Sequence, residues 1–207
     1  MKILIINGHP DPESFCSAAA KRYLQALDTT AHEVECLHLH EMDFDPVLRF
    51  GYRQRMDPEE LIEASQRLLQ WADHLVFIYP IWWSSMPSLM KGWIDRVFTP
   101  GIAYSSNQSG SFIMNFLTGR QFKKLLKGKT AEIIATSMAP NWWYKTFGGL
   151  VSIPDSYGVA VLKNAVLNHC GIKTKHVMVL GEMGRETNTL KRRESFLDSV
   201  QKRALAL

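Results

Sequence analysis

Five short apolar runs recur along the chain, and a segment with helical spacing of its apolar residues separates each run from the next. The runs occupy residues 3–6, 33–39, 75–79, 131–136 and 176–180. Residues 33–39 alternate apolar and polar side chains, whereas the runs 3–6 and 75–79 are continuous, as is typical of strands that are buried on both faces of a parallel sheet. Strands that alternate with helices are joined by right-handed crossovers, which place helices on both faces of the sheet. The pattern therefore predicts an α/β fold with five parallel strands in a three-layer sandwich.

Turn-forming and capping residues set the expected limits of the elements. Ser14 or a neighbouring residue is expected to cap the first helix. Asp57 followed by Pro58 predicts a second helix in which Pro58 takes the first helical position. Pro80 is expected to end the third strand at Tyr79. Further helices are expected to begin near residue 87, to run over residues 160–169 and to begin near residue 187, with long connections over residues 100–129 and 138–157. Of the doubly wound arrangements, the flavodoxin-like strand order 2-1-3-4-5 suits a chain of 207 residues best.

Composition excludes several classes of protein. Hydrophobic residues make up 46% of the chain and charged residues 21%, as expected for a folded domain without disulfide or metal staples. We therefore expect one domain over residues 1–207. The net charge of +4, spread among 20 acidic residues, is too small to predict binding of nucleic acid. The most basic stretch, residues 120–129, is interpreted as a solvated connector rather than as an anion-binding segment.

The cysteines and the first residues bear on location. Cys16, Cys36 and Cys170 lie far apart, and they form neither a C-x-x-C pair nor a zinc-type spacing with histidine. We therefore expect a reducing compartment and no metal site. The first apolar run follows Met1 and Lys2 without a leader pattern, and no stretch of about 18 apolar residues occurs. These features predict a cytoplasmic protein that does not insert into a membrane.

Three loops are expected to form one binding crevice. In an open parallel sheet, ligands bind beyond the carboxyl ends of the strands, where the strand order reverses. For this order, the loops that meet there are residues 8–17, 80–87 and 136–144. The first loop offers backbone N–H groups and the hydroxyls of Ser14 and Ser17 at a helix N-terminus, which favours a phosphate. Neither G-x-G-x-x-G nor G-x-x-x-x-G-K-[ST] occurs, so the predicted anion site is not a Rossmann or P-loop site of the usual kind.

Trp82 and Trp83 follow the third predicted strand directly. One indole at this place can cover a planar ring while backbone N–H groups reach the polar edge of that ring, as the isoalloxazine ring of a flavin requires. Packing in a core or in a dimer interface explains the pair equally well from spacing alone. For Trp93, which lies on the apolar side of its helix, core packing and a cofactor role are equally open. Asp95 and Arg96 are interpreted as a structural pair or as surface charges.

Longer motifs extend from these loops. Gly8-His9-Pro10 is followed by Ser14-Phe15, and Tyr79-Pro80-Ile81-Trp82-Trp83 is followed by Pro87-Ser88-Leu89-Met90 and by the sequence KGWIDRVF over residues 91–98. These motifs resemble the flavodoxin-fold NAD(P)H:quinone oxidoreductase family, and Cys170-Gly171-Ile172 extends the resemblance to nearly the whole chain. The resemblance implies a flavodoxin-like fold, a homodimer and a bound flavin, FAD, with FMN as the alternative. It also implies two-electron hydride transfer from NAD(P)H, the co-substrate, through the flavin to a small quinone-like acceptor.

The resemblance further assigns roles to particular positions. The residues implied to bind the flavin are His9, Ser14, Phe15, Cys16 and Ser17 in the first loop, Pro80, Ile81, Trp82, Trp83 and Ser84 in the second, and Thr136, Ser137, Met138 and Ala139 in the third. His9 is interpreted as a flavin-contact and turn residue rather than as a general base. Tyr144 matches a tyrosine near the flavin carbonyl and is the candidate catalytic residue, because its hydroxyl can stabilise negative charge on the reduced ring.

This chain departs from the family pattern at three places. Cys16 stands where asparagine is common, Met138-Ala139 replaces two glycines, and Leu150 stands where some relatives have histidine. The loss of the glycines limits how closely the backbone can approach a ligand. Two other functions remain open: a flavin-binding ancillary or regulatory subunit of a membrane transporter, and a one-electron carrier. The carrier fits less well, because the chain lacks an acidic excess and a hydroxyl-rich phosphate loop.

Overall fold

A five-stranded parallel sheet organises the protein. The computed structural model describes residues 1–106, 122–140, 157–184 and 186–207. The strands of the sheet are β1 (Lys2–Asn7), β2 (Glu33–His38), β3 (His74–Ile81), β6 (Thr130–Ser137) and β7 (Lys173–Leu180). Their order is β2-β1-β3-β6-β7, and every neighbouring pair is parallel. Because β6 and β7 are the fourth and fifth strands of this sheet, the predicted order 2-1-3-4-5 and the flavodoxin-like fold are confirmed.

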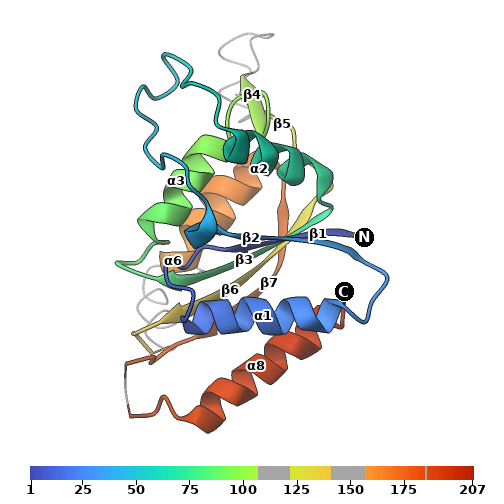
Figure 1. The fold of residues 1–207 in the computed structure, drawn as a ribbon, viewed down its shortest axis with the longest axis vertical. Helices are drawn as coiled ribbons and strands as arrows, with labels where there is room; N and C mark the ends of the chain where they lie inside the picture. Colours follow the sequence, from blue (N-terminus) through green and yellow to red (C-terminus); the bar gives the residue numbers. More distant parts are fainter. Residues whose placement is uncertain (107–121, 141–156, 185) are drawn as a thin grey trace, which may run out of the picture.

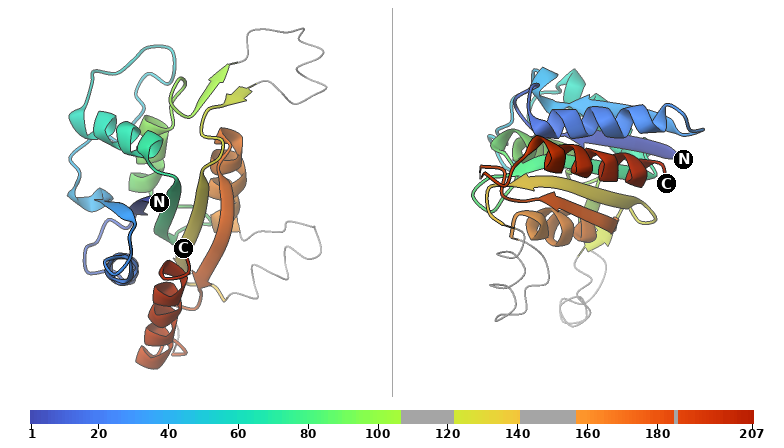
Figure 2. Two further views of the ribbon diagram at one scale, coloured as in Figure 1. Left: turned by 90° about the vertical axis from the view of Figure 1, so that its right-hand side faces the viewer. Right: turned by 90° about the horizontal axis from the view of Figure 1, so that it is seen from below.

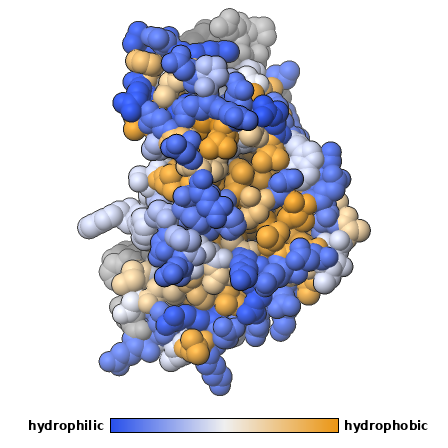
Figure 3. All heavy atoms as spheres, viewed as in Figure 1, coloured by the Kyte–Doolittle hydropathy of each residue, from blue (hydrophilic) through white to orange (hydrophobic). Residues whose placement is uncertain are grey.

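Helices cover both faces of the sheet (Figure 1). One face carries α1 (Phe15–Leu27) and α8 (Leu190–Ala204), and the other carries α2 (Glu60–Trp71) and α3 (Ser88–Val97). The second face also carries a continuous helical segment made of α6 (Tyr157–Ala160), the π-helix η2 (Val161–Leu167) and α7 (Asn168–Cys170). A short 3-10 helix, η1 (Leu39–Glu41), follows β2. Figure 3 shows apolar side chains across the middle of the molecule, with hydrophilic side chains above and below them.

The core has two parts because strand side chains alternate between the two faces of the sheet. Ile3 and Ile5 of β1 pack with the α1 and α8 layer, whereas Leu4 and Ile6 pack with the α2 and α3 layer. Trp93 is fully buried in the second layer, where its Nε1 donates to the Ser65 hydroxyl at 3.1 Å. Of the two interpretations of Trp93, the structure therefore supports core packing.

The second helix begins later than predicted. Its first residue is Glu60 and its N-cap is Glu59, which has extended backbone angles, so the expectation that Pro58 takes the first helical position is wrong. The Glu59 carboxylate accepts hydrogen bonds from the Asp45 backbone N–H at 3.0 Å and from Arg96 at 2.6 Å. These contacts hold Glu59 outside the helix, and they come from parts of the chain that a local capping pattern does not include.

The third strand also differs from the prediction. It continues through Pro80 to Ile81, and Pro80 pairs with Thr136 of β6, so the expected stop at Tyr79 is wrong. The carbonyl of Ile78 accepts from the Gly8 N–H on the β1 side, and Pro80, two residues on, has its nitrogen on that same side. Because the β1 pairing ends at Asn7, no partner strand needs an N–H from Pro80.

The long connection before β6 contains an unpredicted hairpin. Strands β4 (Tyr104–Ser106) and β5 (Phe122–Lys124) pair antiparallel, so the interpretation of residues 120–129 as a connector is wrong where β5 lies. Three-residue strands are too short to show a periodic pattern in the sequence. Figure 2 shows the hairpin beyond α2 and α3, on the side away from α8.

Candidate functional site

The three predicted loops meet at a cavity of about 270 Å³ at the carboxyl edge of the sheet. The predicted residues that line it are His9, Ser14, Phe15, Cys16, Pro80, Ile81, Trp82, Thr136, Ser137 and Met138. Ser17, Trp83, Ser84 and Ala139 belong to the same loops but do not line this cavity. The structure thus brings together residues that lie up to 129 positions apart in the sequence, because parallel strands end at one edge.

The N-terminus of α1 faces this cavity with two free donors. Ser14 caps the helix, and its hydroxyl accepts from the Ser17 N–H at 3.1 Å. In the described part of the chain, the backbone N–H groups of Phe15 and Cys16 have no hydrogen-bond partner. Unpaired N–H groups at a helix N-terminus carry partial positive charge and favour an anion such as a phosphate. The expected anion site is thus supported by two specific donors.

The thiol of Cys16 lies between α1 and β6, on the wall of the cavity. Its side chain is 1% exposed, and its Sγ lies 3.6 Å from the Thr136 hydroxyl. Burial raises the pKa of this thiol to about 12, and the Thr136 contact offsets only part of that effect. The thiol is therefore protonated at neutral pH, which makes it a packing group and weak hydrogen-bond partner rather than a nucleophile.

His9 is held in one orientation by its own loop. Its Nδ1 accepts from the Asp11 backbone N–H at 3.0 Å, and its ring meets the Trp82 ring edge-on with 5.4 Å between centroids. Burial lowers the pKa of His9, and the nearby Asp11 carboxylate opposes that effect. With Nδ1 used as an acceptor, the neutral ring carries its proton on Nε2. His9 therefore offers a neutral N–H donor beside the cavity, in keeping with a contact role.

Trp83 and Ser84 form a strained two-residue turn at the end of β3. Their φ angles are +47° and +57°, and the turn is closed by two hydrogen bonds of 2.9 Å between Trp82 and Ser85. Positive φ at both central residues is the type I′ pattern, which normally selects Asn-Gly. A side chain with a Cβ pays about 1–2 kcal/mol per residue in this region. The turn holds the Trp83 indole fully exposed, outside the core, so core packing does not explain this tryptophan.

The third loop is supported from β7. The Ser137 hydroxyl accepts from the Ala139 N–H at 3.1 Å, and the Ser137 carbonyl accepts from the Met183 N–H at 3.0 Å. Met138 is exposed and contacts Gly184, where a Cβ would collide with the Met138 side chain. Glycine at position 184 thus leaves room for the Met138 side chain.

Two residues that line the cavity were missed by the sequence analysis. Asp11 lies in the first loop, and Met183 follows β7. The chain position of Met183, just after the fifth strand, was a usable signal, because β7 lies next to β6 in the predicted order. Four residues considered from the sequence, Tyr144, Leu150, Trp142 and Trp143, lie outside the described residues.

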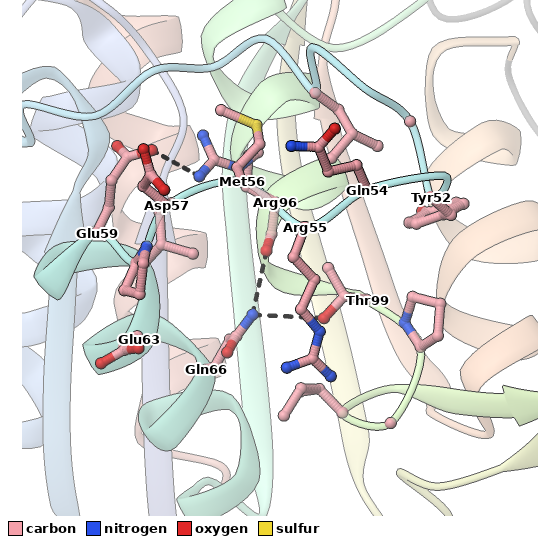
Figure 4. A pocket seen from close by; sticks show the side chains of 17 residues that line it. Tyr52, Gln54, Arg55, Met56, Asp57, Glu59, Glu63, Gln66, Arg96 and Thr99 are labelled. Atoms are coloured by element: carbon pink, nitrogen blue, oxygen red, sulfur yellow. Dashed lines mark hydrogen bonds and ion pairs between the residues drawn. The ribbon is translucent and has the colours of Figure 1, made fainter.

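A second cleft of about 510 Å³ lies between α2, α3 and the loop that precedes α2 (Figure 4). Gln66 bridges the Arg96 carbonyl at 3.2 Å and the Thr99 hydroxyl at 3.4 Å, and Arg96 forms its ion pair with Glu59 here. Asp95 pairs with Lys91 at 2.6 Å. Asp95 and Arg96 therefore do not pair with each other: Asp95 is a surface charge, as expected, whereas Arg96 is buried and pairs with Glu59, so the expectation is wrong for Arg96.

The remaining parts of the described chain offer neither a metal cluster nor a membrane-spanning helix. Over residues 1–106, 122–140, 157–184 and 186–207, no group of three His, Cys, Asp or Glu side chains is placed to hold a metal ion. Within the same ranges, every helix is too short or too polar to cross a membrane.

The donor set around the 270 Å³ cavity fits a flavin nucleotide. The two free N–H groups of α1 suit a phosphate, and the apolar side chains of Ile81 and Trp82 suit the face of a planar ring. The volume is enough for one part of a nucleotide, so a whole dinucleotide must extend beyond the cavity along the edge of the sheet.

Known proteins resemble this chain over most of its length. Residues 1–204 match a family described as having the flavodoxin-like fold. An uncharacterized NAD(P)H oxidoreductase of Haemophilus influenzae is 30% identical over 188 residues, which cover 88% of this chain and 85% of that protein. The mouse ribosyldihydronicotinamide dehydrogenase (quinone) is 28% identical over 193 residues, which cover 83% and 78%. A ribosyldihydronicotinamide dehydrogenase-like protein of Penicillium crustosum is 32% identical over 155 residues, and the match spans 66% of this chain but only 57% of the fungal protein.

Solved structures agree with the fold. A protein from Streptococcus mutans UA159 is 33% identical with a TM-score of 0.77, and the match covers 100% of both chains. An FMN-dependent NADH-azoreductase of Bacillus anthracis, solved with FMN, is 20% identical with a TM-score of 0.69 over 98% of this chain and 97% of that one. At that identity, the azoreductase supports the fold alone.

Proposed function

Because this chain belongs to the flavodoxin-fold NAD(P)H:quinone oxidoreductase family and is an oxidoreductase, we propose that it transfers a hydride from NAD(P)H through a bound flavin to a quinone-like acceptor. The observation that carries the proposal is the cavity at the carboxyl edge of the sheet. Two unpaired N–H groups of α1 face this cavity, and Trp83, whose indole is exposed, directly follows the cavity residue Trp82 at the point where the strand order reverses. The named relatives reported above are oxidoreductases, and none supports the alternative of a transporter subunit.

Different residues of the chain are proposed to bind different parts of the flavin. When bound, a flavin supplies the two-electron chemistry that amino-acid side chains lack. The N–H groups of Phe15 and Cys16 hold the phosphate, and the Trp83 turn projects an indole that can cover the ring. The neutral His9 donates from Nε2 at the rim. Tyr144 is proposed to stabilise negative charge at the reacting ring through its hydroxyl.

We propose FAD as the flavin, with FMN as the alternative, because the motifs after β3 resemble those of FAD users. The test is to purify the chain, denature it and identify the released yellow cofactor by chromatography. The expected result is one FAD for each chain and NAD(P)H-dependent quinone reduction. A freshly purified chain that holds no flavin, and that binds neither FAD nor FMN when these are added, would contradict the proposal.

A pair of variants tests the site itself. Trp83→Ala should weaken flavin binding several-fold, because base and ring stacking on an indole is worth about 1–3 kcal/mol. Leu205→Ala is the control, since Leu205 is also an exposed apolar residue but lies at the C-terminal end of α8 and lines neither cavity. Equal flavin affinity in the wild type and Trp83→Ala would place the indole outside the site.

We also propose a homodimer. Four apolar side chains between residues 47 and 61, beside the second cleft, are between 39% and 61% exposed: Val47, Phe50, Tyr52 and Leu61. An exposed apolar group of this kind is typical of an interaction surface. Sedimentation at micromolar concentration should give the mass of two chains, and a monomer at that concentration would contradict the assignment.

A cytoplasmic location completes the proposal. The three cysteines, Cys16, Cys36 and Cys170, are free thiols, as expected in a reducing compartment. Fluorescence microscopy of a tagged chain in its own cells would test the location, and export of the tagged chain would contradict it.

A further inference from the structure

The side chain of Asn7 contacts three groups in and around the first loop. Asn7 is the last residue of β1 and is fully buried. Its Oδ1 accepts from the His9 backbone N–H at 3.3 Å, and its Nδ2 donates to the Ser17 hydroxyl at 3.0 Å. The same Nδ2 lies 3.3 Å from Nδ1 of His38, the residue beside Asn7 on β2. A buried amide needs such partners, so these contacts fix its position strongly.

The contacts decide which way the Asn7 amide points. A backbone N–H can only donate, so the oxygen of the amide must face His9. The NH2 group then faces Ser17 and His38, which requires an unprotonated Nδ1 on His38. The proton of the neutral His38 ring therefore sits on Nε2, which lies 3.5 Å from the Cys36 sulfur. With the amide in this orientation, a proton on Nδ1 of His38 would face the NH2 group of Asn7 and would have no acceptor there.

Ser17 connects Asn7 to the end of the first loop where the phosphate is proposed to bind. The Ser17 hydroxyl donates to the Asp11 carbonyl at 3.1 Å and lies 3.0 Å from the Ser14 hydroxyl. The Ser14 hydroxyl caps α1, where the unpaired N–H groups of Phe15 and Cys16 begin the helix. Asn7 thus holds both ends of the loop, at His9 and at Ser17, and sets the direction of the two free donors.

We propose that Asn7 and His38 are positioning residues for the flavin phosphate, and that protonation of His38 loosens the first loop and releases the cofactor. The proposal rests on the proposed flavin site. A proton on Nδ1 of His38 would face the NH2 group of Asn7, donor against donor. If the amide turned over, its NH2 group would instead face the N–H of His9, so one contact is lost in either orientation.

The groups around His38 are consistent with a proton-linked device. Cys36 lies on the same strand, and His40 of η1 lies with its ring centroid 5.6 Å from that of His38. The Glu41 carboxylate lies 3.5 Å from Nε2 of His40. From β1, the facing group is the neutral side chain of Asn7, which also donates to Ser17 of α1. Among the contacts of the described residues, none gives the protonated His38 an acceptor at Nδ1.

The test measures the flavin dissociation constant of the full chain at about pH 8 and about pH 5.5, a range in which histidine changes charge. FAD is the probe, added to chain from which the flavin has been removed. For the wild type, the dissociation constant should rise about tenfold at the lower pH, the effect of one or two lost hydrogen bonds. His38→Gln keeps an acceptor but cannot titrate, so its affinity should hardly change with pH.

Asn7→Asp supplies the sharpest contrast. Its carboxylate can accept from both the His9 N–H and a protonated His38, so FAD should bind at least as tightly at the lower pH as at the higher. His176→Gln, a change of an exposed histidine on β7, is the matched control and should keep the wild-type pH dependence. Wild-type affinity that is flat with pH, or a His38→Gln variant that keeps the wild-type dependence, would overturn the proposal.

A second measurement separates this proposal from the proposed function. In the flavin-free chain, ¹⁵N NMR should show Nδ1 of His38 unprotonated at the higher pH and should show the Ser17 amide signal shifting as His38 gains a proton. If the chain binds no flavin at either pH, the proposed function fails, and the NMR result still decides the linkage between His38 and the loop. A Ser17 signal that does not follow His38 would refute that linkage.

Discussion

The strained turn at Trp83 and Ser84 gives a prediction whose sign can be worked out from the structure. Ser84 has a φ of +57°, a region in which a residue with a Cβ is disfavoured. Ser84→Gly removes that cost, and the more flexible unfolded chain takes back part of the gain, so the net stabilisation should be about 1 kcal/mol. For a protein of this size, that corresponds to a rise in Tm of about 2–4 °C.

The neighbouring serine is a matched control. Ser85 is not among the residues with positive φ, so glycine at that position relieves no strain and only adds freedom to the unfolded chain. Ser85→Gly should therefore lower the stability by about 0.5–1 kcal/mol. Thermal unfolding of both variants, prepared without flavin, compares two equal chemical changes one residue apart. The reasoning predicts shifts of opposite sign.

Ser84→Gly should weaken flavin binding although it stabilises the flavin-free protein. A glycine at position 84 lets the Trp83 indole sample more orientations, so part of the preorganisation for ring binding is lost. The flavin dissociation constant of Ser84→Gly should rise a few-fold although the flavin-free protein has become more stable. Shifts of the same sign in Ser84→Gly and Ser85→Gly would refute the strain argument, and unchanged flavin affinity in Ser84→Gly would refute its link to binding.

Three further predictions concern other parts of the molecule. Tyr144→Phe should slow flavin reduction by NAD(P)H in stopped-flow experiments without loosening the flavin, and unchanged kinetics would remove Tyr144 from the mechanism. Glu132 is 1% exposed and pairs with Arg203, so Glu132→Gln should lower the free energy of unfolding in urea by about 3 kcal/mol, and a loss near zero would contradict the buried pair. Because the pKa of Cys16 is raised to about 12, only about one part in ten thousand of this thiol is ionised at pH 8. Alkylation followed by mass spectrometry should therefore label Cys16 only after unfolding, and rapid labelling of the native chain would show the pKa argument to be wrong.

The sequence alone was sufficient for the architecture and for the place of the cavity at the carboxyl edge of the sheet. Five apolar runs separated by helical segments determine a parallel sheet, because the period of the apolar residues decides which element buries them. Once the strand order is set, the loops after the first, third and fourth strands must end at one edge. His9, Trp82 and Thr136 meet at one cavity for this reason, although the chain between them is long.

Other features depended on contacts that no local pattern contains. Helix α2 starts at Glu60 because Arg96 and Asp45 bind Glu59. Strand β3 continues through Pro80 because its pairing with β1 has already ended at Ile78. Asn7 is the last residue of β1, and its side-chain contacts depend on His38 of a neighbouring strand.

The exposed Trp83 shows the same division between sequence and tertiary structure. Its place after a strand pointed to a ring-binding loop, and the spacing left core packing equally open. The folded chain excluded core packing, because the turn closed by Trp82 and Ser85 forces two residues into positive φ and turns the indole outward. A ring-binding loop and a dimer interface both fit the exposed indole. Periodicity therefore determined where the loops lie, whereas long-range hydrogen bonds and backbone closure decided how their side chains point, since those terms are set by neighbours in space rather than in sequence.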